Sequence, residues 1–253
     1  MASSLFGGCA TTGVNKGDVN LISLDEEWQL GQQMEAQVAQ QVRLVNDPQA
    51  LSYLNQIGQS IVNQTPLANL PWDFHIVQDP AINAFSIPGG HVYVNTGLIA
   101  AAQNASELAG VMAHEISHGV ARHATEQITK QYGLSVAAGL LLGQNPNILE
   151  QIVSQIVAGG ALAKFSRDDE READQLGVRY MAGAGYDPHG MADMFRILLA
   201  KDQSQPSAVS QFFSTHPLTQ ERIQNVTQQA NAMNTSGLRT NDSGFASFKS
   251  RVV

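Results

Sequence analysis

Residues 111–119 read Val-Met-Ala-His-Glu-Ile-Ser-His-Gly, and the rest of the chain is interpreted around this stretch. The flanking residues favour a helix, which we expect to begin after Ser106 as its N-cap and to run to near Gly133. Four residues turn a helix by about 400°, so His114 and His118 face the same way with their Cβ atoms roughly 6 Å apart. Two imidazoles at this spacing can bind one metal ion.

Glu115 stands about 100° from His114 around the same helix. It can therefore reach a water molecule beside the metal without binding the metal itself. His-Glu-x-x-His is the signature of two zinc ligands with a glutamate that serves as general base of a metalloprotease. The alternative is a chance match, with both histidines on a helix surface or in a core. His123 lies about 140° from His118, and we expect it to be exposed.

The charged stretch of residues 165–177 offers a third ligand. A catalytic zinc ion normally has three protein ligands and one open position. Glu170 and Asp174 are four residues apart and share a helix face, so Glu170 suits the metal and Asp174 suits the second N–H of a ligating histidine. Glu172 should point elsewhere and pair with a neighbouring arginine. The alternative is a solvated helix face held by salt bridges.

Composition limits the function and the metal chemistry. The chain has 253 residues, of which 43% are hydrophobic and 14% charged, which suits one globular domain with a substantial core. Its net charge of -8 and its lack of long basic runs argue against nucleic-acid binding. Cys9 is the single cysteine, so a metal site must use histidine and carboxylate ligands. No apolar run reaches the ~18–20 residues of a membrane span.

The chain divides into three parts by composition. We expect a flexible leader over residues 1–22, one metallopeptidase domain over residues 23–233, and a tail over residues 234–253 that carries a short docking helix. Residues 4–10 resemble the end of a bacterial lipoprotein signal, in which small residues precede a lipidated cysteine. A lipidated Cys9 would tether the protein to a membrane, whereas the alternative is a lone cysteine without a role.

Hydrophobic period and capping residues predict a mostly helical α+β fold, with a small β-sheet or hairpin beside the helix of the His-Glu-x-x-His motif. The expected elements, in chain order, are a helix after the Ser23 capping box, a helix after Asp47, a strand over residues 72–77, a hairpin around Pro88-Gly89-Gly90, two short apolar helices in residues 134–163, a helix after Asp187, a polar linker over residues 202–210 and a helix that starts at Pro217.

The second strand of the hairpin is a candidate for substrate binding. Proteases hold their substrates extended, and an exposed strand edge does this through main-chain hydrogen bonds. We therefore predict a substrate-binding edge at residues His91, Val92, Tyr93 and Val94, with an ordinary hairpin as the alternative. His75, in the preceding strand, is expected to face solvent.

Three separated motifs together resemble one family. They are residues 114–118, the run Ser166-Arg167-x-x-Glu170-x-x-Ala173-Asp174, and Thr215-His216-Pro217 followed by Arg222. They are similar to the gluzincin metallopeptidases of the HtpX and CAAX-prenyl-protease type, and above all to the soluble periplasmic, BepA-like branch. Asn83-Ala84-Phe85 and the Pro-Gly-Gly turn are also similar, and the resemblance spans roughly residues 25–230. The membrane-spanning helices of other members and the helical-repeat extension of the BepA type are not seen.

The resemblance implies a zincin-type metallopeptidase domain with one Zn²⁺ per chain. The roles it implies are zinc ligation by His114, His118 and Glu170, general base catalysis by Glu115, and orientation of a ligand by Asp174. His216 matches a family histidine that either closes the fourth metal position in a latent state or helps to bind the oxyanion. Arg222 would support the loop that carries His216.

The function expected from these features is that of a zinc metalloendopeptidase. By the resemblance, its substrates would be unfolded or misassembled cell-envelope proteins, in the periplasm or at the outer membrane. The alternative is a zinc-holding chaperone or adaptor with a latent active site. A purely structural zinc site is disfavoured, because such sites have four fixed ligands and no base beside the metal. The sequence does not define the oligomeric state.

Overall fold

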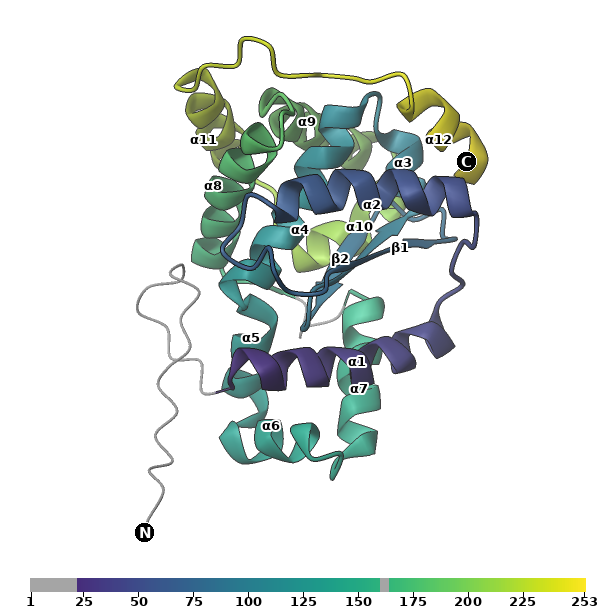
Figure 1. Ribbon diagram of the computed structural model, residues 1–253, viewed down its shortest axis with the longest axis vertical. Helices are drawn as coiled ribbons and strands as arrows, with labels where there is room; N and C mark the ends of the chain where they lie inside the picture. The colour runs from purple at the N-terminus through teal and green to yellow at the C-terminus, as the bar shows by residue number, and fades with distance from the viewer. Residues whose placement is uncertain (1–21, 160–163) are drawn as a thin grey trace.

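The computed structural model describes residues 22–159 and 164–253. Their helices pack on both faces of a small β-sheet (Figure 1). The predicted leader, except residue 22, lies outside the described residues, as does Cys9. Among the residues described, every helix is too short or too polar to cross a membrane. The mostly helical α+β class predicted from the sequence is confirmed.

Along the described residues, two helices precede three short strands, and all later elements are helices. Their bounds are α1 (Leu24–Gln41), α2 (Pro48–Val62), β1 (Asp73–Val77), β2 (Ala84–Ile87), β3 (His91–Asn95), α3 (Thr96–Ala101), α4 (Ala105–Ala121), α5 (His123–Tyr132), α6 (Leu134–Leu141), α7 (Pro146–Val157), α8 (Arg167–Gly183), α9 (His189–Ser204), α10 (Pro206–Thr215), α11 (Gln220–Asn231) and α12 (Phe245–Val252).

The first two helices begin where their capping residues predict. The Ser23 hydroxyl accepts a hydrogen bond from the Glu26 backbone N–H, and the Glu26 side chain accepts one from the Ser23 backbone N–H, which completes the capping box of α1. Asp47 caps α2 through hydrogen bonds to two backbone N–H groups, and Pro48 occupies the first helical position.

The three strands form one sheet in the order β1-β3-β2. β2 and β3 make the predicted antiparallel hairpin, and its turn uses Gly89 and Gly90 at φ values of 84° and 80°. β1 joins the other side of β3 in parallel, with Asp73 beside His91.

β3 is therefore the central strand, and the predicted substrate-binding edge at His91, Val92, Tyr93 and Val94 is wrong. Both hydrogen-bonding sides of β3 are already used, one by β1 and the other by β2, so a peptide cannot pair with it. The sequence revealed the hairpin, but not the parallel pairing with a strand about 18 residues earlier, because that pairing is not encoded by a local turn. The described residues place no further strand against the outer side of β2.

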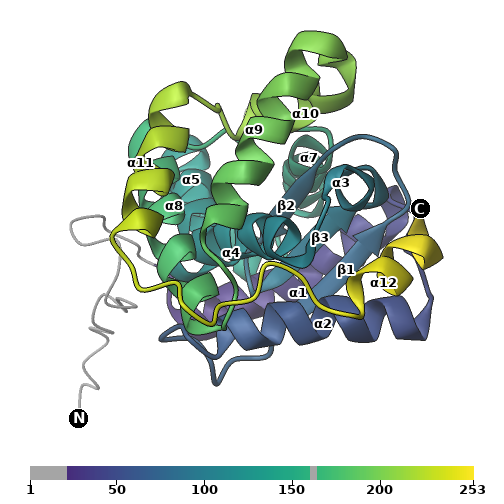
Figure 2. The same ribbon diagram turned by 90° about the horizontal axis from the view of Figure 1, so that it is seen from above.

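The two faces of the sheet support two separate hydrophobic cores. Phe74, Ile76, Val92 and Val94 point into the core that contains α2, α4, α8 and α9. Their neighbours Val77, Phe85 and Tyr93 point the other way, toward α1, α6 and α7. Figure 2 shows α4 near the centre of the molecule, with α2, α8 and α9 around it. The sheet therefore separates α4 from α1.

The predicted helix over residues 106–133 is in fact two helices. α4 begins after Asn104, which caps it in place of Ser106, and ends at Arg122, whose φ of 63° lies in the left-handed region. This conformation is costly for a residue with a side chain, and buried contacts hold it. Arg122 Nε donates to Glu27 Oε2 at 2.5 Å, and Arg122 Nη2 donates to the Ile22 carbonyl at 2.5 Å.

Two predictions for the C-terminal third are wrong, and one is confirmed. The predicted polar linker over residues 202–210 is helical, because Pro206 starts α10 directly after α9 ends. Pro217 does not start a helix; α11 begins at Gln220, with the Thr219 hydroxyl as its cap. The docking helix of the tail is present as α12, where the Phe248 ring stacks on Tyr53 of α2 at a centroid distance of 4.7 Å.

Gly31 allows α1 to approach the hairpin turn. A Cβ atom at this position would lie 2.3 Å from the Pro88 carbonyl oxygen and 2.8 Å from Gly89 Cα. We predict that Gly31→Ala lowers the free energy of unfolding by about 1–3 kcal/mol, because backbone atoms must move apart. Urea denaturation measures this change. Gly183→Ala is the matched control, since the three atoms nearest to its Cβ position all belong to the flexible Gln64 side chain. An unchanged or raised stability of Gly31→Ala would contradict the close approach.

Candidate metal centre

Four buried side chains from three helical segments converge at one point. His114 and His118 come from α4, Glu170 from α8, and His216 from the C-cap of α10. Each offers one nitrogen or oxygen atom, and these atoms all lie within 4.8 Å of one another. The side chains are almost fully buried, with His114 0% and His216 1% exposed. The structure thus brings together the predicted ligands and the histidine of the third motif.

The convergence depends on a close crossing of α4 with α8 and α9. Gly177 faces Ala113, where a Cβ atom would lie 3.2 Å from the Ala113 carbonyl carbon. Gly110 faces Met191, where a Cβ atom would lie 2.6 Å from the Met191 Cα. Small residues at both contacts let the helix backbones approach, which carries Glu170 to the histidines. A capping box at Ser166 fixes where α8 begins.

The distances within the cluster suit a metal ion. A tetrahedral ion with ligands at 2.0–2.1 Å separates its ligand atoms by about 3.3 Å. His114 Nε2 lies 3.1 Å from His118 Nε2, 3.3 Å from His216 Nδ1 and 3.5 Å from Glu170 Oε2. Imidazole nitrogen and carboxylate oxygen atoms at these separations are the atoms that bind a catalytic zinc ion. The residues present therefore fit a metal ion.

Asp174 and Arg222 hold the other side of His114. Asp174 Oδ1 lies 2.9 Å from His114 Nδ1, the ring nitrogen on the side away from the cluster. Arg222 donates to Asp174 through Nε at 2.7 Å and through Nη2 at 2.8 Å. This two-pronged contact fixes the carboxylate plane, and with it the orientation of the imidazole. Arg222 also pairs with Glu170 and donates to the Pro217 carbonyl beside His216.

Charges around the cluster favour ionised Glu170. Burial alone would raise the pKa of this carboxyl, but His216 and Arg222 hold the pKa well below its usual range. Burial lowers the pKa of His118 well below its usual value. Burial also acts to lower the pKa of His114, but contacts with Asp174 and Glu170 outweigh it and raise that pKa to about 9. In the metal-free protein, the cluster thus contains a carboxylate and a neutral His118.

His123 is buried beside His118, so the prediction of an exposed side chain is wrong. Its Nδ1 lies 2.9 Å from His118 Nδ1, and its Nε2 lies 3.3 Å from Glu172 Oε2. Glu172 thus contacts a histidine, in addition to which the sequence predicts pairing with a neighbouring arginine. A continuous helix would have placed His118 and His123 on different faces. The left-handed turn at Arg122 redirects the chain between them and brings the two rings together. No local sequence signal marks that turn.

Glu115 lies next to the cluster but outside it. Ser86 of β2 donates to Glu115 Oε2 at 3.2 Å, and His216 Nε2 lies 3.3 Å from Glu115 Oε1. The cavity between these residues and Phe165 has a volume of about 10 Å³, room for about one water molecule. A peptide can enter this space only if His216 or its neighbours move.

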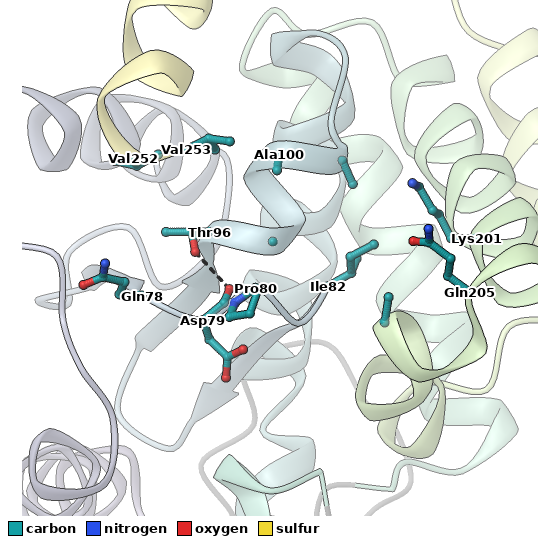
Figure 3. A pocket seen from close by; sticks show the side chains of 13 residues that line it. Gln78, Asp79, Pro80, Ile82, Thr96, Ala100, Lys201, Gln205, Val252 and Val253 are labelled. Atoms are coloured by element: carbon teal, nitrogen blue, oxygen red, sulfur yellow. Dashed lines mark hydrogen bonds between the residues drawn. The ribbon is translucent and has the colours of Figure 1, made fainter.

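Two of the larger hollows are defined by the residues that line them. One, of about 210 Å³, lies between α8 and α11 and reaches Glu170 and Arg222. The other, of about 530 Å³, lies among the β1–β2 loop, α3, α9 and the C-terminus, where Thr96 donates to the Asp79 carbonyl at 2.9 Å (Figure 3). None of the candidate site residues lines this second hollow.

Comparison with known proteins places these residues in a family context. The sequence model of Peptidase family M48 matches residues 48–230. The chain is 30% identical over 223 residues to the beta-barrel assembly-enhancing protease of Escherichia coli K12, which covers 84% of this chain and 45% of that protein. It is also 30% identical over 215 residues to the mitochondrial metalloendopeptidase OMA1 of Schizosaccharomyces pombe, covering 84% of this chain and 63% of that protein.

A plant relative gives the same family with a shorter match. The mitochondrial metalloendopeptidase OMA1 of Arabidopsis thaliana is 34% identical over 167 residues, which are 66% of this chain and 33% of that protein. The chain thus spans about half the length of the beta-barrel assembly-enhancing proteases that it matches. The family match includes all four residues of the buried cluster together with Glu115, Asp174 and Arg222. Because the family model matches well over half of the sequence, the chain belongs to peptidase family M48.

Proposed function

We propose that the chain is a zinc-dependent metalloendopeptidase. The observation that carries this proposal is the buried convergence of His114, His118 and Glu170 with Glu115 beside them. These three residues would hold one Zn²⁺, since two imidazoles and a carboxylate are a common ligand set of catalytic zinc. When bound, the ion supplies a Lewis acid that polarises the scissile carbonyl and makes water acidic enough to attack it.

Glu115 is the proposed general base. Its carboxylate would take a proton from the attacking water and then give that proton to the leaving amine. The hydrogen bond from Ser86 holds one carboxylate oxygen at 3.2 Å, which leaves the other oxygen, Oε1, for the proton transfer. Glu115 is only 1% exposed, so bulk solvent does not surround it, and this burial strengthens each electrostatic contact with the developing charge.

We propose that the substrate binds along β2, in place of the edge predicted on β3. β2 is the outer strand on this side of the sheet, and it carries Ser86, which contacts Glu115. An extended peptide that pairs with an outer strand gains main-chain hydrogen bonds without a sequence requirement. This mode of binding suits substrates that are unfolded, because a folded chain has its backbone groups already paired.

His216 supports the proposal of a latent state. Its Nδ1 lies 2.9 Å from Glu170 Oε1 and 3.3 Å from His114 Nε2, in the fourth corner of the cluster. Its Nε2 lies 3.3 Å from the proposed base. One side chain thus faces both the metal position and Glu115, and it has to move before water and a peptide carbonyl reach them. The alternative role, binding of the oxyanion, requires His216 to stay near the metal during the reaction.

The proposed substrates are unfolded or misassembled proteins of the cell envelope. This proposal rests on the resemblance to the BepA-like branch and on the relatives named beta-barrel assembly-enhancing protease. We accordingly propose a location in the periplasm or at the outer membrane, with a lipidated Cys9 as the tether. A net charge of -8 fits the expectation that nucleic acid is not a partner.

A second candidate function is that of a zinc-holding chaperone or adaptor. The closed arrangement of His216 favours it, because the site as it stands has room for about one water molecule. Such a protein would bind unfolded clients without cutting them. The two functions differ in whether removal of His216 releases cleavage.

The first prediction concerns the base. Glu115→Gln should retain zinc but cleave an unfolded protein at least about 10²-fold more slowly, because the amide cannot accept the proton. Digestion of a reduced, unfolded protein by zinc-loaded wild type and variant measures this, with bound zinc quantified in both. His189→Asn, a surface change on α9, is the control. Cleavage by Glu115→Gln at the wild-type rate would rule out the mechanism.

The second prediction concerns the closed state. His216→Ala should raise the cleavage rate above that of the wild type, because the metal corner and Glu115 become accessible. Initial rates on the same unfolded protein measure this, with the double variant that also carries Glu115→Gln as the control for a contaminating protease. A fall of about 10²-fold or more would instead assign His216 to the oxyanion. If no variant cleaves while all protect a client from aggregation, the chaperone function holds.

The third prediction concerns the support of His114. Asp174→Asn should weaken zinc binding by about 10–100-fold, because the amide no longer fixes the imidazole that binds the metal. Competition with a zinc chelator of known affinity measures this. Arg222→Lys keeps the charge but loses the two-pronged contact, so its zinc affinity should fall between those of the wild type and Asp174→Asn. Equal zinc affinity in all three proteins would refute the support role.

A further inference from the structure

A second group of metal-binding side chains lies on the opposite face of the sheet. Side chains alternate along a strand, and the parallel register sets Asp73 beside His91 and His75 beside Tyr93. These four residues face α1, where Glu35 lies above them. The candidate metal centre borders the other face of the sheet, where Ser86 meets Glu115. The two groups share no residue.

In the described part of the chain, both histidines of this group have a buried nitrogen atom without a hydrogen bond. His91 is 4% exposed, and its Nδ1 makes no hydrogen bond to any residue that the structure describes. The same holds for His75 Nε2. A buried polar atom without a hydrogen bond is unfavourable, so such atoms call for a ligand that the protein itself does not supply.

Glu35 brings a carboxylate to both unpartnered nitrogens. Its Oε1 lies 3.5 Å from His75 Nε2, and its Oε2 lies 3.8 Å from His91 Nδ1. One ligand atom from each of the three residues lies within 4.8 Å of the other two. Asp73 Oδ2 lies 3.8 Å from His91 Nδ1 and offers a fourth ligand. These separations are longer than hydrogen bonds but are close to those between ligands of one ion.

We propose that Glu35, His75 and His91 form a second metal site, which takes a divalent transition-metal ion such as Zn²⁺. Two imidazoles and a carboxylate are the donor set that this class of ion prefers. Burial lowers the pKa of His75 and of His91, which favours the neutral imidazole that metal ligation requires. An ion can enter from solvent, because the Glu35 and Asp73 side chains are 38% and 58% exposed.

The second site connects α1 to the sheet. Glu35 belongs to α1, His75 to β1 and His91 to β3, so one ion would join three elements. α1 also carries Glu27, which holds Arg122 at the end of α4. Metal at the second site would stabilise this packing, because an ion that binds the folded chain raises its stability by mass action. The role we assign is therefore structural and independent of peptide cleavage.

Metal content tests the proposal. We expect the wild type, equilibrated with Zn²⁺ and freed of excess by dialysis, to hold two zinc ions per chain. Glu35→Gln and His75→Asn should each hold one, because each removes a ligand of the second site. His118→Asn should also hold one, because it removes a ligand of the candidate metal centre. His189→Asn is the matched control, with a surface histidine 2.7 Å from Asp187, and it should hold two.

The variants also separate failure of this proposal from failure of the proposed function. If the wild type holds one zinc ion that His118→Asn loses and Glu35→Gln keeps, the second site is refuted. If that one ion is lost by Glu35→Gln and kept by His118→Asn, the second site stands and the candidate metal centre fails. As a second readout, added Zn²⁺ should raise the Tm of His118→Asn, but not that of the double variant with Glu35→Gln. Equal shifts in both would overturn the proposal.

Discussion

The burial of four metal-binding side chains at one point is the constraint on which the rest of the structure depends. A buried carboxylate without a partner would cost several kcal/mol, and Glu170 avoids this cost through Arg222 and the surrounding histidines. Arg222 in turn needs Asp174, and Asp174 faces His114, so the charges form one connected network. The charges of this network stay paired only if α4, α8 and α11 keep their relative positions. The packing of these helices therefore determines the chemistry of the site.

Small residues make this packing possible. Gly110 and Gly177 let α9 and α8 approach the backbone of α4, and every residue of α4 except Gly119 is buried. A helix enclosed in this way cannot shift to accommodate a larger side chain, so the geometry of its two histidines is fixed by the core and not by the metal. His216 differs from them, because it lies in the loop between α10 and α11, where Arg222 donates to the neighbouring Pro217 carbonyl. The part proposed to move is thus a loop and not a helix of the core.

Local periodicity predicted the residues of the site that share a helix face, and it failed where the chain turns or pairs over a distance. His114 and His118, like Glu170 and Asp174, follow from the four-residue spacing of a helix. His123 did not, because the left-handed turn at Arg122 depends on Glu27, which is 95 residues away in the sequence. The central place of β3 depends likewise on a parallel pairing with β1. Neither contact leaves a local pattern, since both are set by tertiary structure.

The sheet, though small, relates the two groups of metal-binding residues. On one face, Ser86 of β2 contacts the proposed base, and on the other face His75 and His91 lie beneath Glu35. The alternation of side chains makes these two environments possible in strands of four or five residues. Because β3 pairs with both neighbours, a displacement of α1 that shifts β1 or β3 also acts on β2, the strand proposed to bind substrate. The arrangement of α1 on the sheet is thus mechanically connected to the site that it does not touch.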